Sequence, residues 1–71
     1  MYYVYVLYSE TKGKYYIGQT NDVEKRLRRH NNGQENYTKT GIPWMLVHQV
    51  EVETRSAAMK LERKLKNFKA D

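Results

Sequence analysis

The sequence contains no cysteine and only two histidines, His30 and His48. The absence of cysteine excludes both a disulfide framework and a thiolate zinc site as reinforcement for the fold. Two histidines do not make a structural metal site by themselves. No apolar run approaches the roughly 20 residues that span a lipid bilayer, so no membrane partner is expected. The N-terminus lacks the basic start and small-residue cleavage site of a signal peptide, and the expected compartment is therefore the cytoplasm.

What the chain does contain is aromatic residues and positive charge. Its 71 residues include seven tyrosines and one tryptophan, and its formal net charge is +5. A chain of this length is expected to form one domain, residues 1–71, which buries only about 60% of the surface of its unfolded state. The tyrosines, Trp44, Phe68 and the aliphatic residues must then supply one compact core. The positive charge favours an anionic partner.

The first half of the chain has the pattern of a hairpin followed by a helix. Residues 2–8 and Lys14–Thr20 have strong strand preference, and the short connection between them contains Gly13. This combination predicts two antiparallel strands. Thr20, Asn21 and Asp22 supply oxygen atoms that can cap the first turn of a helix, and Gly33 ends that helix.

The second half repeats the alternation of strand and helix. Residues 34–43 form a polar loop, Trp44–Val52 has the pattern of a third strand, and Thr54 or Ser56 caps a last helix that runs to about Lys69. An apolar stripe of helical period would lie on the sheet and consists of Ala57, Leu61, Leu65 and Phe68. The predicted fold is therefore α+β with the order ββαβα, in which a small three-stranded sheet is flanked by helices.

Charged residues on the two helices allow more than one interpretation. Arg26 and His30 are four residues apart and share a face of the first helix. By pattern alone, they favour a solvated basic surface over a functional site. Glu62 is the only acid within "KLERKLKNFK" and could simply form an i, i+4 ion pair with Lys66.

The strand residues are likewise ambiguous by pattern alone. Tyr5 and Tyr16 suit cross-strand packing in a core as well as a chemical role. Successive strand residues face opposite ways, so Tyr15 should lie on the other face from Tyr16. His48 alternates with apolar residues, which predicts a satisfied core histidine rather than a ligand.

Four short stretches occur together, in order and over nearly the whole chain. They are "YVYVL" at residues 3–7, "YYIG" at residues 15–18, "RLRRH" at residues 26–30 and "LERKLK" at residues 61–66. As a set they resemble the GIY-YIG nuclease domain. The resemblance is greatest to its small stand-alone bacterial members, which share the "YT" of residues 37–38. The second signature is intact, whereas "VYV" replaces the nominal Gly-Ile-Tyr of the first and keeps only Tyr5.

The resemblance implies an endonuclease that hydrolyses phosphodiester bonds in DNA with one divalent metal, Mg²⁺ or Mn²⁺. It implies that Glu62 is the metal ligand, that Arg26 holds the scissile phosphate and that Tyr16 is the general base. Tyr5 would orient water or support Tyr16, and His30 would assist proton transfer or phosphate binding. A single carboxylate is compatible with Mg²⁺, which keeps most of its waters. Because a phenol has a reference pKa of about 10 and an imidazole one of about 6.5, His30 is the rival base.

Further residues are expected to contact nucleic acid. Gly18 lacks a Cβ atom, so the strand end can approach a substrate backbone closely, although a tight packing site is the alternative. Tyr37, Thr38 and Lys39 lie in the polar loop, where a plain surface loop is equally compatible with the pattern. The full set of expected nucleic-acid contacts is Gly18, Arg26, Arg29, Tyr37, Thr38 and Lys39.

Three functions stay open on the sequence. The first is a metal-dependent endonuclease on DNA, with RNA as an open alternative substrate. The second is a nucleic-acid-binding domain that has lost useful turnover, and the third is a protein-interaction module with the aromatic hairpin and Trp44 as its contact surface. An isolated acid inside a basic helix favours the first, because binding alone does not need it. The chain is expected to be a monomer or a weak homodimer paired through an open strand edge.

Overall fold

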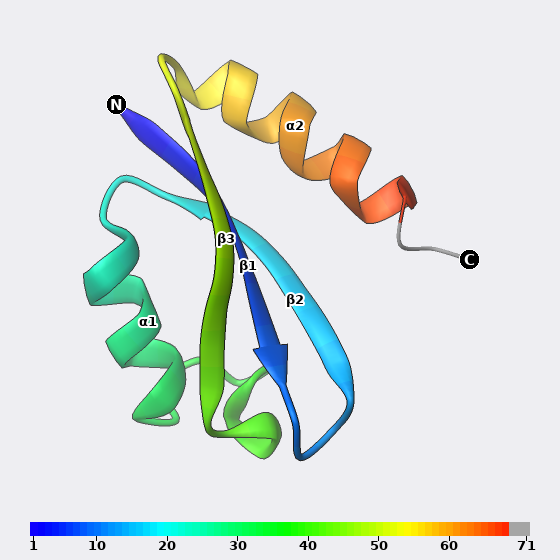
Figure 1. Cartoon of the computed structure of the whole chain (residues 1–71). Coiled ribbons are helices and arrows are strands. Elements are labelled where there is room, and N and C mark those ends of the chain that lie inside the picture. Colours follow the sequence, from blue (N-terminus) through cyan, green and yellow to red (C-terminus); the bar gives the residue numbers. More distant parts are fainter. Residues whose placement is uncertain (69–71) are drawn as a thin grey trace.

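The computed structural model describes residues 1–68, apart from the side chain of Phe68. Its elements are β1 (Tyr2–Ser9), β2 (Lys14–Thr20), α1 (Val23–Asn31), the short 3-10 turn η1 (Lys39–Gly41), β3 (Trp44–Val52) and α2 (Arg55–Phe68). The predicted α+β fold with the order ββαβα is therefore confirmed (Figure 1). The expected end of the last helix at Lys69 and the expected packing of the Phe68 side chain lie outside the described residues.

The three strands form one antiparallel sheet with β1 in the centre. The strand order is β2-β1-β3, and β1 pairs antiparallel with both neighbours. Gly13 makes the β1–β2 turn with a positive φ of 63°, a conformation that L side chains rarely adopt. The register of β1 and β2 places Tyr5 opposite Gly18 and Leu7 opposite Tyr16. These residues share one face of the sheet.

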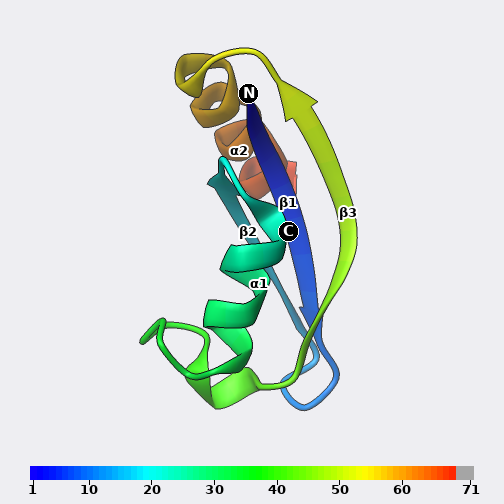
Figure 2. The ribbon, with the colours of Figure 1, turned by 90° about the vertical axis from the view of Figure 1, so that its left-hand side faces the viewer.

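The two faces of the sheet are covered by different helices, as Figures 1 and 2 show. On one face, Val4 and Ile17 pack against α2. On the other face, Tyr5 and Leu7 belong to a second cluster that includes side chains from α1. The core is thus divided into two parts by the sheet, because successive side chains of β1 point to opposite faces.

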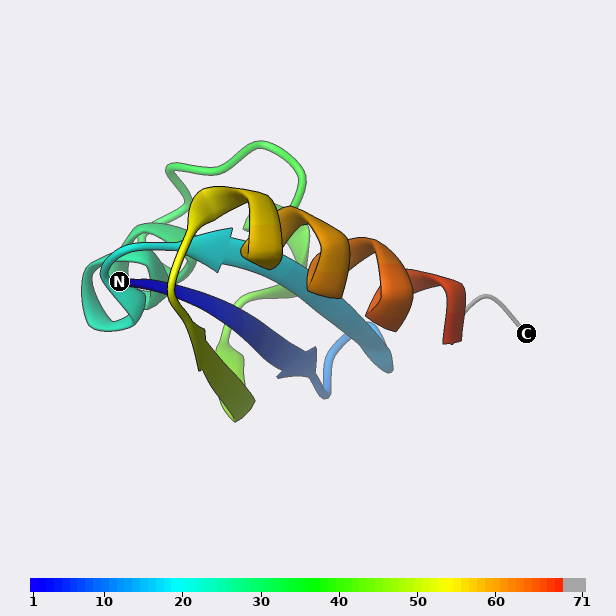
Figure 3. The same cartoon turned by 90° about the horizontal axis from the view of Figure 1, so that it is seen from above.

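Helix α2 runs alongside β2 (Figure 3) and packs on the sheet through Ala58, Leu61 and Leu65. Leu61 and Leu65 of the predicted stripe are confirmed in this contact. Ala57 is partly buried, as Leu61 and Leu65 are, and the fully buried Ala58 was not predicted.

Local capping fixes where the helices begin. The Asp22 carboxylate accepts a hydrogen bond from the Lys25 amide at 3.1 Å, and the Thr54 hydroxyl accepts from the Ala57 amide at 3.1 Å. Both interactions use oxygen atoms that the sequence indicated as caps. Within residues 1–68, no helix has the length and apolarity needed to cross a bilayer.

The loop between α1 and β3 is fastened to the end of the sheet where β1 turns into β2 (Figures 1 and 2). The Asn31 side chain holds the start of β3, since its Oδ1 accepts from the Trp44 amide at 2.7 Å and its Nδ2 donates to the Trp44 carbonyl at 3.1 Å. The Trp44 indole donates to the Thr38 carbonyl at 2.7 Å. Trp44 is buried, so its expected role in a protein-contact surface is wrong.

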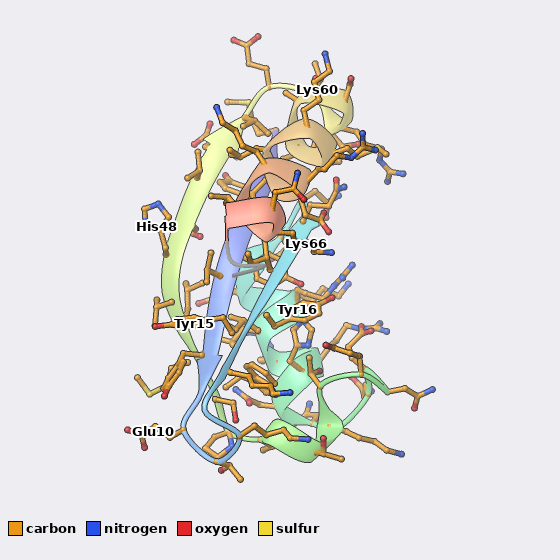
Figure 4. All side chains as sticks on the ribbon, turned by 90° about the vertical axis from the view of Figure 1, so that its right-hand side faces the viewer. Glu10, Tyr15, Tyr16, His48, Lys60 and Lys66 are labelled. Atoms are coloured by element: carbon orange, nitrogen blue, oxygen red, sulfur yellow. The ribbon has the colours of Figure 1, made fainter. Side chains whose placement is uncertain are left out.

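The outer strand β3 is less protected than the sequence indicated, on both of its faces. Its residues from Met45 to Gln49 are exposed, among them His48, which Figure 4 shows on the outer strand. The prediction of a core histidine at this position is therefore wrong. Alternation along a strand identifies two faces, but it does not reveal that α2 packs mainly on β2 and β1.

Candidate active site

A hydrogen-bonded chain of three buried side chains links β1, α1 and the following loop. The Tyr5 hydroxyl lies 3.0 Å from His30 Nε2, and His30 Nδ1 lies 2.7 Å from Thr38 Oγ1. Both ring nitrogens of His30 therefore have a hydroxyl partner, and because a hydroxyl can donate or accept, either tautomer of the neutral imidazole is satisfied.

Burial favours the uncharged forms of Tyr5 and His30 in this hydrogen-bonded group. His30 is 1% exposed and Thr38 is 0% exposed, so the interpretation of His30 as part of a solvated basic face is wrong. Burial also lowers the pKa of His30, which favours the neutral imidazole that the hydrogen bonds require. Tyr5 is 1% exposed, and burial raises its pKa, with a further increase from neighbouring Tyr16 and an opposing effect of the Arg26 guanidinium.

Gly18 provides the space that brings the two tyrosines together. A Cβ atom at this position would lie 2.7 Å from Tyr5 Oη and 3.0 Å from Tyr16 Cε2. Gly18 is itself buried, and the rings of Tyr5 and Tyr16 are 6.3 Å apart between centroids. The structure therefore gives Gly18 the tight-packing role that the sequence left as an alternative.

The Tyr16 side chain is close to residues of both helices, α1 and α2. Its ring contacts that of His30 edge-on, with 5.0 Å between the centroids. Burial raises the pKa of Tyr16, while the charges of Lys66 and Arg26 oppose that increase and those of Glu62 and Glu35 add to it. Tyr16 is thus the common neighbour of α1 and α2 at the open edge of β2.

Tyr15 takes the opposite direction, as the alternation of strand residues predicted. Its ring lies 4.8 Å from that of Tyr8, on the face covered by α2, whereas Leu7 is the partner of Tyr16 on the other face. Figure 4 shows Tyr15 and Tyr16 on either side of β2, with Lys66 of α2 near Tyr16.

Glu62 forms the ion pair that the sequence left as its alternative role. Lys66 Nζ lies 2.8 Å from Glu62 Oε2, and this hydrogen bond raises the pKa of Lys66. Lys66 borders two hollows, one shared with Tyr16 and the other with Glu62. Because one side chain joins both hollows, the carboxylate and the phenol belong to the same region of the surface.

The residues expected to contact nucleic acid do not all reach the surface. Tyr37 and Lys39 are exposed, and Arg29 is half-exposed and paired with Glu35 at 3.0 Å. Arg26 borders a hollow together with Arg29 at the start of α1. Thr38 is fully buried and its hydroxyl is bonded to His30, so the expectation of a nucleic-acid contact by its side chain is not supported.

Sequence reasoning missed two contributions to this site. The first is Thr38 as the partner of His30, for which the "YT" pair was the only signal. The second is Lys66 beside Tyr16, since helical spacing revealed its pair with Glu62 but not its position over β2.

Known proteins resemble this chain over nearly its whole length. The model of the GIY-YIG catalytic domain matches residues 1–71. A UPF0213 protein of Staphylococcus saprophyticus is 41% identical over 68 residues, which cover 94% of this chain and 82% of that protein. A UPF0213 protein of Haloquadratum walsbyi is 40% identical, with 94% of this chain and 75% of that protein covered. No solved structure matches this chain.

The chain belongs to the GIY-YIG family. Membership supports a nuclease-type function in general and implies a nucleic-acid substrate. Nucleases of this family generally use divalent metals.

Proposed function

We propose that this protein is a divalent-metal-dependent endonuclease that hydrolyses phosphodiester bonds in DNA. The observation that carries the proposal is the position of Tyr16, which touches His30 and lies within the electrostatic field of Arg26, Glu62 and Lys66. Phosphodiester hydrolysis needs an activated water, stabilisation of charge on the phosphate and assistance to the leaving oxygen. This group of side chains contains candidates for each requirement.

Arg26 is the proposed phosphate ligand. Its guanidinium is permanently charged and offers several donors in a fork that suits an anion with more than one oxygen. It lies near the Tyr5 hydroxyl and opposes the increase in the pKa of that group. Arg26 thus lies beside a buried tyrosine whose hydroxyl is bonded to His30 and whose ring occupies the space that Gly18 leaves.

Glu62 is the proposed ligand of Mg²⁺ or Mn²⁺. The described residues contain no group of three or more His, Cys, Asp or Glu side chains that could hold a metal ion. A single carboxylate fits Mg²⁺, which retains several waters and takes one or two carboxylates together with substrate phosphate. When bound, the ion would supply positive charge for the phosphate and neutralise the carboxylate that raises the pKa of Tyr16. Lys66 would compete with the ion for this carboxylate, since its ammonium lies 2.8 Å from Glu62 Oε2.

Tyr16 is the proposed general base, and His30 is the alternative. The two assignments predict different pH profiles, since the pKa of Tyr16 is raised above its ordinary value and that of His30 is lowered. With Tyr16 as the base, the cleavage rate rises about tenfold per pH unit through the neutral range until the phenol is ionised. With His30 as the base, the rate is flat above about pH 6.5.

Cleavage assays test the proposal directly. Supercoiled plasmid and a branched oligonucleotide would be incubated with Mg²⁺ or Mn²⁺ and, separately, with EDTA. We expect metal-dependent cutting that Glu62→Ala and Tyr16→Phe abolish while the matched variants Glu53→Ala and Tyr15→Phe retain it. Circular dichroism would show that each variant is folded. Cutting that survives Glu62→Ala would refute the assignment of the metal ligand.

A nucleic-acid-binding domain without turnover is the second candidate. The observation in its favour is that Glu62 is already paired with Lys66, while the pKa of Tyr16 is raised. Nucleic-acid binding that persists in EDTA, together with no cutting by the wild-type protein in the presence of Mg²⁺ or Mn²⁺, would select this candidate.

A further inference from the structure

A pocket of about 530 Å³ lies beside the proposed catalytic residues, at the open edge of β2. Its lining comes from β2, from the loop after α1 and from α2, and consists of Tyr15, Tyr16, Ile17, Tyr37 and Lys66. Its volume falls in the range of about 300–1,000 Å³ that is usual for small-ligand sites. Water activation and phosphate binding do not require three tyrosines at this edge, so the proposed catalytic roles do not account for the lining of the pocket.

Tyr37 is the most distinctive part of this lining. Its side chain is 80% exposed, the largest value among the large apolar side chains that the structure describes. Its ring nevertheless lies 5.8 Å from that of Tyr16, at an angle of 42°. Tyr15, which is 50% exposed, also borders the pocket, although its ring packs beside that of Tyr8. Aromatic surface is therefore offered to solvent next to Tyr16.

The chemistry of the lining fits one nucleotide. Exposed aromatic faces stack on nucleobases of any sequence, because every base has a π-face. The Lys66 ammonium borders the pocket and would attract the phosphate that accompanies a base. A chain with a net charge of +5 favours such an anionic ligand over a neutral one.

The base must be unpaired to enter. Inside a duplex both faces of a base are covered by its neighbours in the stack, and a side chain reaches such a face only when the base is single-stranded or extruded. Tyr16 belongs both to this pocket and to the proposed catalytic group. A base seated here would bring its own phosphate near Lys66, the side chain that is paired with Glu62.

We propose that this pocket binds a single unpaired nucleobase, stacked against Tyr37, beside the phosphate that is cut. The substrate would then be a single strand or a duplex interrupted by an unpaired nucleotide. The proposal rests on the proposed function only for the position of the cut. Binding of the base needs neither metal nor turnover, and it can be measured without either.

The test is a binding titration in EDTA at low salt. A short single strand that carries one 2-aminopurine would be titrated with the wild-type protein, Tyr37→Phe, Tyr37→Ala and the loop control Asn36→Ala. We expect quenching of 2-aminopurine by the wild type, Tyr37→Phe and Asn36→Ala. Tyr37→Ala should lose affinity by about 5- to 150-fold, the range measured when a stacking aromatic is replaced by alanine. A blunt duplex should show less than about a twofold effect of the same substitution, since its bases are already stacked.

Three results would overturn the base pocket. They are the absence of single-strand binding by the wild type, equal affinities of Tyr37→Ala and wild type, and equal losses on single strand and duplex. The last result would make Tyr37 a general backbone contact. A folded Tyr37→Ala variant is expected because this side chain is exposed, and a thermal melt verifies it.

The outcome for the pocket is separable from the outcome for catalysis. Quenching that depends on Tyr37, together with no metal-dependent cutting, would retain the pocket and refute the endonuclease. Metal-dependent cutting that is indifferent to Tyr37 on every substrate would retain the endonuclease and refute the pocket.

Discussion

Replacing Thr38 by valine should destabilise the protein by an amount that the buried chain of hydrogen bonds determines. Valine keeps the volume of threonine but removes the oxygen that lies 2.7 Å from His30 Nδ1. His30 and Thr38 are 1% and 0% exposed, so water does not replace the lost partner. Within the described residues no buried side-chain nitrogen or oxygen lacks a hydrogen-bond partner, and the substitution would create the first.

Moving the imidazole hydrogen does not avoid the cost. With the hydrogen on Nδ1, a buried donor is unsatisfied. With the hydrogen on Nε2, the nitrogen Nδ1 is an unsatisfied acceptor and the Tyr5 O–H loses its acceptor. An unsatisfied buried group costs about 1–3 kcal/mol. For a domain of this size, each kcal/mol lowers the melting temperature by about 4–8 °C.

Urea denaturation measures this loss, with Trp44 as the fluorescent reporter because it is the only tryptophan in the chain. The control is Thr40→Val. The exposed Thr40 hydroxyl accepts a hydrogen bond from Lys12 Nζ at 3.3 Å, and its removal should change the free energy of unfolding by less than about 0.5 kcal/mol. In a His30→Leu background, Thr38→Val should cost much less, because both partners are then apolar. If Thr38→Val costs no more than Thr40→Val, the buried chain does not stabilise the fold as described.

Three further substitutions or conditions give distinct outcomes. Gly18→Ala should lower the free energy of unfolding by about 1–3 kcal/mol in urea denaturation, because its Cβ would lie 2.7 Å from Tyr5 Oη. Lys66→Met should tighten Mn²⁺ binding about twofold in a spin-resonance titration without nucleic acid, since an exposed i, i+4 pair with Glu62 is worth about 0.3–0.5 kcal/mol. The free energy of unfolding should fall as the pH decreases below about 6.5, by at most about 1.4 kcal/mol per unit for His30, because the unfolded imidazole takes up a proton before the folded one.

Each of these expectations has a matched comparison. For Gly18→Ala, a Tyr5→Phe background should recover part of the loss, and full additivity would contradict the proposed clash. For metal binding, Lys64→Met removes the same charge from an exposed position of α2, and equal affinities of the two lysine variants would exclude competition at Glu62. For the fall in stability at low pH, an unchanged slope in folded His30→Gln would contradict the assignment to His30.

The fold was predictable because its signals are local. Strand preference, a glycine at the hairpin turn and side-chain caps at Asp22 and Thr54 all act over a few residues, and each occurs where the sequence indicated. Ala58 was missed because adjacent alanines at positions 57 and 58 both have helical spacing to Leu61, at i, i+4 and i, i+3. His48 was misplaced because periodicity along a strand does not reveal which strand a distant helix covers.

The sequence indicated some of the neighbours in the candidate site, but not the role of Thr38 or the position of Lys66 beside Tyr16. Alternation in β2 separated Tyr15 from Tyr16, and helical spacing related Glu62 to Lys66. The burial of His30 depends on a loop that folds back to place Thr38 against it, and no periodic pattern describes such a loop. The net effect of burial on the pKa of Tyr16 depends on distances between three elements, which a sequence does not contain.

The two proposed functions of this site, cutting and binding of a base, should respond to different perturbations. Burial raises the pKa of Tyr16, so use of that phenol as a base depends on added positive charge near Glu62. Stacking of a base on Tyr37 needs only aromatic surface, and it is independent of that charge. Glu62→Gln should therefore abolish cutting and leave single-strand affinity within about twofold, whereas Tyr37→Ala should weaken the affinity in the presence and in the absence of metal. In the double variant the loss of affinity should equal that of Tyr37→Ala alone, because independent sites contribute additively. A loss of affinity in Glu62→Gln as large as that in Tyr37→Ala would show instead that the acid and the base pocket act as one unit.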